Sequence, residues 1–140
     1  MIREMTAADI SAALDTDRAA FKNTWSAAEF EAELDKDYSV YLICDNGYGG
    51  IWCIYETAEL IRIAAREKRR GTGAALMTAL IKAAAERGCE RMLLEVRESN
   101  LPARTLYEKF GFKEISVRRG YYDGEDAIIM ERNLDAIIQA

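Results

Sequence analysis

The chain has 140 residues, half of them hydrophobic, and carries a formal net charge of -5 at pH 7. This length suits one α/β domain with a full core, so we expect a single domain over residues 1–140. The acidic balance argues against a nucleic-acid partner, and the absence of histidine argues against histidine-based catalysis and most metal sites. We therefore predict no bound metal.

Nothing in the sequence predicts export or membrane insertion. No apolar run approaches the roughly eighteen residues of a membrane-spanning helix, and the N-terminus lacks the layout of a signal peptide. Cys44, Cys53 and Cys89 form no CxxC pair, which indicates reduced thiols. We expect a cytoplasmic protein with no membrane partner, and the oligomeric state stays open.

The first third of the chain predicts two helices. Thr6 and Asp9 form a capping-box-like pattern for a helix to about residue 21, and Ser26 with Glu29 repeats it for a helix to about residue 35. The loop between them, residues 21–25, carries aromatic side chains.

Three strands should follow. Residues 38–44 and 48–55 are rich in aromatic and β-branched residues, and Asp45-Asn46-Gly47 between them predicts a hairpin turn. Residues 60–65 form the third strand, whose register stays open.

The second half alternates helices and strands. Apolar residues at helical spacing predict a helix over 71–87, which Gly88 ends, and the apolar run 92–96 predicts a strand buried on both faces. Ser99 or Asn100 caps a helix with Pro102 in its first turn, ending at 110–111.

Two last strands, 112–117 and 127–130, are joined through a turn at 122–124. We expect an α/β fold with a mixed, mainly antiparallel central sheet flanked by helices.

Residues 66–73, Arg-Glu-Lys-Arg-Arg-Gly-Thr-Gly, combine basic side chains with two glycines between a strand and a helix. Glycines let backbone N–H groups approach a phosphate, and a helix N-terminus adds partial positive charge. A solvated basic turn explains the same pattern about equally well.

This segment resembles the signature of the GNAT family of N-acetyltransferases, Gln/Arg-x-x-Gly-x-Gly/Ala, with Lys68 at its first position. In that family the loop holds the pyrophosphate of coenzyme A. The resemblance implies cofactor contacts for Arg69, Arg70, Gly71, Thr72, Gly73 and Ala74, and the preceding Ile63, Ala64 and Ala65 look like the family's strand segment Ile-Ala-Val.

The second half is similar in particular to the bacterial ribosomal-protein alanine N-acetyltransferases of the RimI type. The likeness covers roughly residues 48–132 and rests on Leu-Glu-Val-Arg-x-Ser-Asn at 94–100, Leu-Tyr-x-x-x-Gly-Phe at 106–112, and Arg-Arg-x-Tyr-Tyr at 118–122. It implies acetyl-CoA as co-substrate and a protein N-terminus, most plausibly the alanine of a ribosomal protein, as acceptor.

Glu95 lies in an otherwise apolar strand, where an ionised carboxylate is unfavourable unless it is paired or reaches water. On spacing alone, a structural role as a carboxylate bonded to the backbone or paired near Arg97 explains this better than a function does. The resemblance implies the second: Glu95 accepts the proton of the attacking amine, whose pKa of about 8 for an α-amino group requires only a modest base.

Tyr107 is the candidate acid, because a phenol with a pKa of about 10 can protonate a leaving thiolate with a pKa of about 8.5. Its helical spacing with Leu106 and Phe110 also fits plain core packing, and the acid role comes from the resemblance. Asn100 caps a helix or bonds the pantetheine arm, and the N–H groups of Ile63 or Ala65 polarise the thioester carbonyl.

Trp25, Tyr121 and Tyr122 are expected at the acceptor site, since large aromatics in loops and strand ends often line grooves. The acidic series of residues 29–37 attracts a basic peptide or simply forms a solvated helix face. Two alternatives remain: acetylation of lysine or small amines, and a non-catalytic acyl-CoA-binding module.

Overall fold

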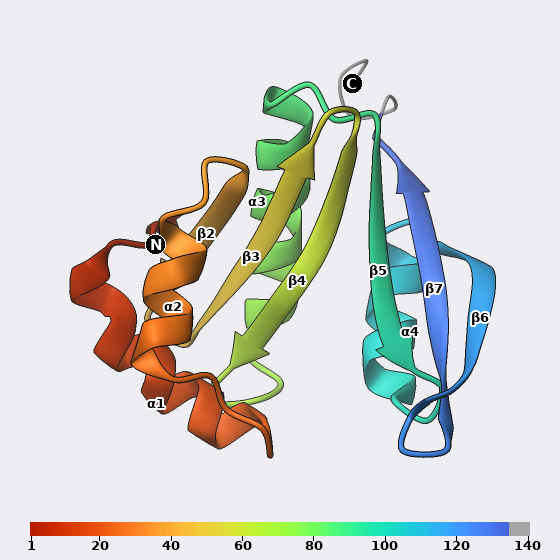
Figure 1. Ribbon diagram of the computed structural model, residues 1–140, viewed down its shortest axis with the longest axis horizontal. Helices are drawn as coiled ribbons and strands as arrows, with labels where there is room; N and C mark the ends of the chain where they lie inside the picture. The colour runs from red at the N-terminus through yellow and green to blue at the C-terminus, as the bar shows by residue number, and fades with distance from the viewer. Residues whose placement is uncertain (135–140) are drawn as a thin grey trace.

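Seven strands form one mixed sheet in the computed structural model, which describes residues 1–134 (Figure 1). The strands follow the order β1-β2-β3-β4-β5-β7-β6, and only β4 and β5 run parallel. The strands are β1 (Arg3–Glu4), β2 (Ser39–Cys44), β3 (Gly47–Ile54), β4 (Thr57–Ala65), β5 (Arg91–Arg97), β6 (Lys113–Tyr122) and β7 (Glu125–Asn133). The predicted mixed, mainly antiparallel sheet is confirmed.

Helices cover both faces of this sheet (Figure 1). They are the short 3-10 helix η1 (Ala7–Asp9), α1 (Ile10–Ala20), α2 (Ala27–Leu34), α3 (Thr72–Glu86) and α4 (Leu101–Lys109). The first two α-helices pack on one face of β2–β4, and α3 and α4 lie on the other. The main core forms under α3 and α4, where Leu76, Leu80, Met92 and Leu94 are almost fully buried.

Local signals account for the helix starts. The Ser26 hydroxyl accepts a hydrogen bond from the Glu29 N–H at 3.1 Å, and the Ser26 N–H donates to the Glu29 carboxylate at 3.0 Å, a reciprocal cap for α2. Asn100 caps α4 by accepting from the Ala103 N–H at 3.3 Å. None of the described helices is long and apolar enough to cross a membrane.

The parallel pair β4 and β5 is joined over a short stretch only. Its pairing runs from Thr57 opposite Arg91 to Glu59 opposite Leu93. Ile61 is then a bulge, because Ile51 and Gly50 on β3 pair with residues 60 and 62. The two strands diverge toward their C-terminal ends (Figure 1). The divergence leaves that edge of β4 without a neighbouring strand.

Some predicted boundaries were wrong for identifiable reasons. Strand β4 begins at Thr57 instead of residue 60, because a two-residue turn at Tyr55-Glu56 without glycine or asparagine joins it to β3; Tyr55 itself has φ 56°. Strand β5 is not buried on both faces: Leu93 and Glu95 are half-buried, since α1 and α2 cover only β2–β4. The last two strands are longer than predicted and meet at Asp123-Gly124.

Candidate active site

The basic turn between β4 and α3 has the backbone geometry of an anion site. Residues 66–71 are exposed, and Arg69 and Gly71 adopt positive φ angles of 63° and 75°. Gly71 is the N-cap of α3, with no side chain bonded to the first N–H groups of the helix. A β-carbon on Gly71 would meet nothing within 4 Å, so the approach is open. These residues fit the pyrophosphate that the sequence predicted here.

Asn46 fixes this turn from the opposite hairpin. Its buried amide nitrogen donates to the Glu67 carbonyl and to the Thr72 hydroxyl, both at 2.8 Å, and its amide oxygen accepts from the Glu67 N–H at 3.0 Å. The sequence pattern predicts Asn46 only as a turn residue. No local signal identifies its partners, which lie 21 and 26 residues away.

The strand that precedes the turn presents backbone donors toward the diverging edge. The Arg66 N–H donates to the Asn46 carbonyl at 2.7 Å, which marks this as a hydrogen-bonded pair of the β3–β4 ladder. Because bonded and non-bonded pairs alternate in antiparallel ladders, the N–H groups of Ile63 and Ala65 turn away from β3. They face the side where the pairing with β5 has ended. Polarising a thioester carbonyl requires this orientation.

Glu95 lies on the sheet face opposite α3 and α4, beside that divergence. Its side chain is 25% exposed and pairs with Arg118 at 3.2 Å. Glu59, opposite Leu93 in the sheet, shares this face with Glu95. Burial and the neighbouring Glu95 raise the pKa of Glu59 above its usual value. The sequence predicts neither neighbour, although Glu59 stands out as a second carboxylate beside an apolar stretch.

Tyr107 belongs to the core layer under α4. It is 7% exposed and its ring contacts Phe112 at 6.0 Å between centroids. Within residues 1–134 its hydroxyl makes no hydrogen bond. Burial, followed by the nearby Tyr122, raises the pKa of Tyr107 to about 12. The phenol is therefore protonated at neutral pH, and its hydroxyl has no hydrogen-bond partner among the described residues.

Tyr122 interacts electrostatically with both candidate reacting groups, Glu95 and Tyr107. Burial and then Glu95 raise the pKa of Tyr122, and Tyr122 in turn interacts electrostatically with Tyr107. The Arg97 guanidinium lies 4.3 Å from its ring centroid. Glu95 and Tyr107 each interact electrostatically with this phenol, Glu95 from the sheet face opposite α4 and Tyr107 from beneath α4.

The three aromatics expected at the acceptor site lie in two places. Tyr121, 53% exposed, contacts Tyr122 edge to face at 5.0 Å on β6. Trp25 lies on the α1–α2 loop and packs against Phe30 at 5.1 Å. No ring contact within residues 1–134 joins Trp25 to the tyrosine pair, but the loop and the β6–β7 turn lie at the same end of the sheet (Figure 1).

The acidic series on α2 is not one solvated face. Glu33 is buried, accepts from the Tyr41 hydroxyl and from the Trp52 indole N–H at 2.9 Å, and pairs with Lys36. Its neighbours at residues 29, 31, 35 and 37 are exposed. Glu33 therefore ties α2 to the sheet and offers no charge to a peptide.

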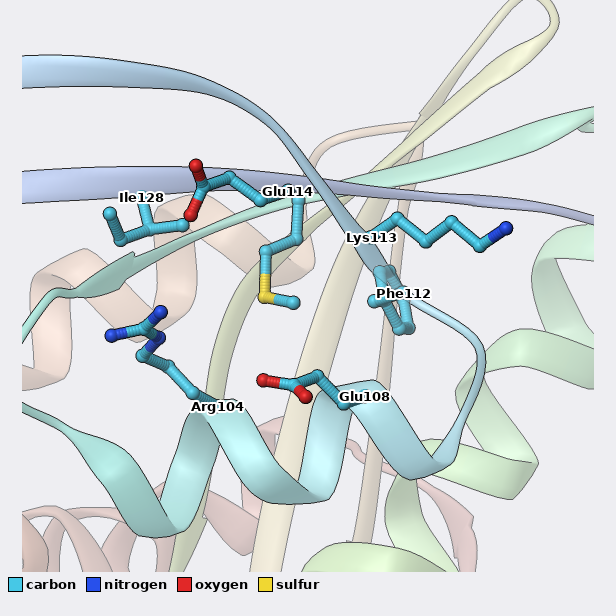
Figure 2. A pocket seen from close by; sticks show the side chains of 7 residues that line it. Arg104, Glu108, Phe112, Lys113, Glu114 and Ile128 are labelled. Atoms are coloured by element: carbon cyan, nitrogen blue, oxygen red, sulfur yellow. The ribbon is translucent and has the colours of Figure 1, made fainter.

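A hollow elsewhere lies between α4 and the strands β6 and β7, with charged side chains around an apolar floor (Figure 2). It contains neither of the candidate reacting residues nor the glycine turn, and its lining is Arg104, Glu108, Phe112, Lys113, Glu114, Ile128 and Met130. Across residues 1–134, no group of three or more histidine, cysteine or acidic side chains is placed to hold a metal ion.

Comparison with known proteins gives a consistent result. Residues 9–112 match the model of the acetyltransferase (GNAT) family. The chain is 34% identical to a putative ribosomal protein bS18-alanine N-acetyltransferase of Bacillus subtilis, with 92% of each chain covered. It is 36% identical to the ribosomal protein bS18-alanine N-acetyltransferase of Escherichia coli, over 92% of this chain and 94% of that protein.

Structural comparison agrees. The crystal structure of the ribosomal-protein-S18-alanine N-acetyltransferase from Escherichia coli superposes with a TM-score of 0.86 at 32% identity, covering 96% of this chain and 93% of that one. The resemblance to this group of enzymes is confirmed. The chain belongs to the acetyltransferase (GNAT) family and is an acetyl-CoA-dependent N-acetyltransferase.

Proposed function

We propose that this enzyme acetylates the N-terminal alanine of a ribosomal protein, by direct attack of the amine on acetyl-CoA in a ternary complex. The main support is the 36% identity, over nearly the whole of both chains, to an enzyme named for that acceptor. A ribosomal acceptor also places the enzyme in the cytoplasm.

Acetyl-CoA supplies the acetyl thioester. Different residues are assigned to its pyrophosphate, its thioester carbonyl and its pantetheine arm. The N-terminus of α3 and the turn of Arg69 and Gly71 suit the pyrophosphate. The N–H groups of Ile63 and Ala65 suit the thioester carbonyl. Asn100 uses its side-chain oxygen as a helix cap, which leaves its amide N–H groups for the pantetheine arm.

Glu95 and Tyr107 then move the protons. Glu95 takes a proton from the acceptor amine as the nitrogen–carbon bond forms, and Tyr107 gives its proton to the sulfur as the carbon–sulfur bond breaks. The Arg118 guanidinium forms an ion pair with the Glu95 carboxylate at 3.2 Å. The acceptor's ammonium group carries the same charge, so it can take the place of Arg118 there; it loses one proton to solvent, and the neutral amine that then attacks gives its second proton to Glu95.

The test follows the release of free thiol from acetyl-CoA with three acceptors: a ribosomal-protein peptide starting with alanine, the same peptide blocked at its N-terminus but containing lysine, and a small polyamine. The proposal expects turnover with the first only. Equal turnover with the polyamine contradicts it in favour of small-amine acetylation. Binding of acetyl-CoA without turnover of any amine contradicts it in favour of a non-catalytic module.

A further inference from the structure

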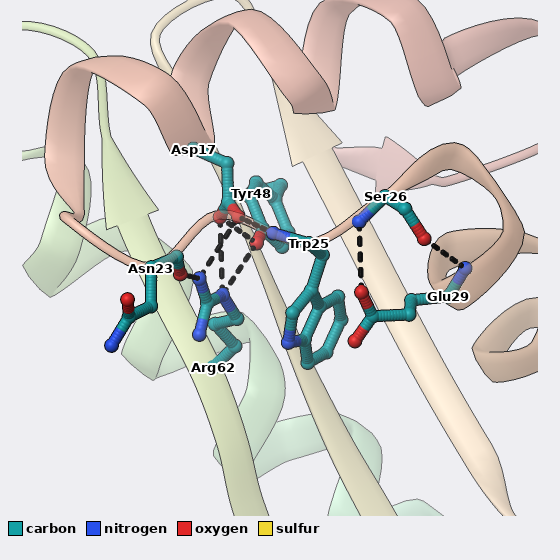
Figure 3. Close-up of polar contacts among 7 residues, drawn as sticks. All are labelled: Asp17, Asn23, Trp25, Ser26, Glu29, Tyr48 and Arg62. Atoms are coloured by element: carbon teal, nitrogen blue, oxygen red, sulfur yellow. Dashed lines mark hydrogen bonds and ion pairs between the residues drawn. The ribbon is translucent and has the colours of Figure 1, made fainter.

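Arg62 is a charged residue within the apolar part of β4, and its partners lie on α1, β3 and the loop at residues 21–25. Its Nε and Nη2 donate to the two carboxylate oxygens of Asp17 at 3.1 and 2.9 Å (Figure 3). The Nε also lies 3.2 Å from the Tyr48 hydroxyl. The side chain is 17% exposed, so this fork-to-fork pair is largely shielded from water.

Asp17 is fully buried at the C-terminal end of α1 and uses both of its oxygens. Besides Arg62, it accepts from the Tyr48 hydroxyl at 2.5 Å and from the Trp25 backbone N–H at 2.8 Å. One carboxylate thus joins a helix, the sheet and the loop that follows the helix. A buried carboxylate with this many donors holds a single geometry.

The Asp17–Arg62 pair contacts three residues of the loop, of which Asn23 and Trp25 are drawn in Figure 3. The guanidinium lies over the rings of Phe21 at 4.0 Å and Trp25 at 4.7 Å, and its Nη2 donates to the Asn23 carbonyl at 2.8 Å. The residues between Phe21 and Trp25 are exposed. Arg62 therefore holds the loop together with Phe21 and Trp25, whose rings pack against the core.

Arg62 directly precedes Ile63, Ala64 and Ala65, whose backbone faces the thioester in the proposed function. The loop lies at the end of the sheet where β4 and β5 have diverged, as does the β6–β7 turn on the other side (Figure 1). A loop anchored on this strand keeps a fixed position relative to the reacting carbonyl.

We propose that Asp17 and Arg62 are positioning residues that hold the loop of residues 21–25 as one wall of the acceptor site. They touch neither substrate, and they set the affinity for the acceptor by presenting Trp25 beside the thioester strand. This inference rests on the proposed N-terminal acetyltransferase function.

The test is Arg62→Lys, which keeps the positive charge near Asp17 but loses the planar fork and the stacking on two rings. We expect the KM for the alanine peptide to rise about tenfold, while kcat and the KM for acetyl-CoA stay within about twofold. Phe21→Leu, which removes one ring and leaves the ion pair intact, should raise the peptide KM by about threefold.

A second measurement reports on the loop without activity. Lys22 is exposed within the loop, so a lysine-specific protease should cut after it faster in Arg62→Lys than in the wild type. Arg3→Lys is the matched control, because Arg3 forms a comparable fork with Asp9 at 2.7 and 2.6 Å away from the loop. It should change neither the peptide KM nor this cleavage.

An unchanged peptide KM in both Arg62→Lys and Phe21→Leu overturns the inference, as does a fall in kcat alone. If the wild type acetylates no peptide, the proposed function fails instead. Cleavage after Lys22 then still decides whether Arg62 holds the loop.

Discussion

The two halves of the sheet are held together in different ways. In β1–β4, buried polar side chains make directed contacts: Asp17 with Arg62, Glu33 with Tyr41 and Trp52, and Asn46 with Thr72. In β5–β7, the ion pairs lie at the surface, with arginine side chains 43–87% exposed, and every residue of β6 before Tyr122 is exposed.

In the proposed function, this contrast separates the part of the sheet that holds the cofactor from the part that carries the reacting groups. The first half carries the glycine turn and the strand assigned to the cofactor, where a fixed backbone matters. The second half carries Glu95, and α4 beside it carries Tyr107, where access for an acceptor matters. Variants in the first half should therefore change stability and binding, and variants in the second should change turnover.

The largest expected effect is that of Tyr107→Phe. Removing the general acid should lower kcat by about 100-fold or more. The hydroxyl makes no hydrogen bond within residues 1–134, so stability should change by less than about 1 kcal/mol. Because burial raises the pKa of Tyr107 to about 12, its protonated form persists up to that pH, and kcat should show no decline centred near pH 10.

Steady-state kinetics between pH 6 and 10, with urea unfolding alongside, measure these effects. Tyr55→Phe, at a residue that is 91% exposed, is the control and should leave kcat unchanged. Full activity of Tyr107→Phe would remove the acid role and reduce Tyr107 to a packing residue.

Glu95→Gln should lower kcat by about 100-fold at neutral pH, with a smaller deficit as the pH rises and hydroxide can accept the proton of the attacking amine instead. The pH dependence of kcat for the variant and the wild type measures this. Glu59→Gln, on the same face, should lower kcat by less than about threefold. The opposite ranking of the two variants contradicts the assignment of Glu95 as the base and favours Glu59.

In the other half, Asn46→Ala should weaken acetyl-CoA binding by about tenfold and lower the free energy of unfolding by about 2 kcal/mol. The reason is the loss of the bonds that tie the turn to the β2–β3 hairpin. Titration calorimetry and urea unfolding measure both. The exposed neighbour Asp45→Ala is the control, and equal affinity for both variants would show that the turn needs no clamp.

The smallest effect is expected for Arg119→Ala. Its ion pair with Asp126 is 3.8 Å long and the arginine is 87% exposed, so unfolding should change by less than about 0.5 kcal/mol. If urea unfolding showed that Arg119→Ala lowers the free energy of unfolding as much as Asn46→Ala does, the contrast between the two halves of the sheet would be wrong.

Local chemistry made much of the fold predictable from the sequence. The cap of Ser26 with Glu29, the glycine at residue 71 and the proline at residue 102 each mark a boundary through their own neighbours. The order of strands β5-β7-β6 and the length of the β4–β5 pairing depend on contacts far apart in the chain, and no local pattern indicates them.

The candidate site divides in the same way. Glu95 is identifiable from the sequence because a charge in an apolar strand needs a reason, and the same argument identifies Arg62, which the prediction above leaves out. Its partner Asp17 lies 45 residues away, so no local pattern predicts the ion pair between them. Glu33 was misread with its acidic neighbours, although its spacing of three from the buried Phe30 puts both on the inner side of α2.

In the proposed function, acetyl-CoA binds beside the edge of β4 where the pairing with β5 has ended, and so contributes to the structure of the enzyme. The β4–β5 ladder consists of three residue pairs, and the edge of β4 beyond them has no neighbouring strand. We expect bound acetyl-CoA to slow hydrogen exchange of the backbone amides at residues 63–65 and to raise the melting temperature. Without acetyl-CoA, the backbone at residues 63–65 would open more readily. The melting temperature of the protein would then depend on the concentration of its acetyl donor.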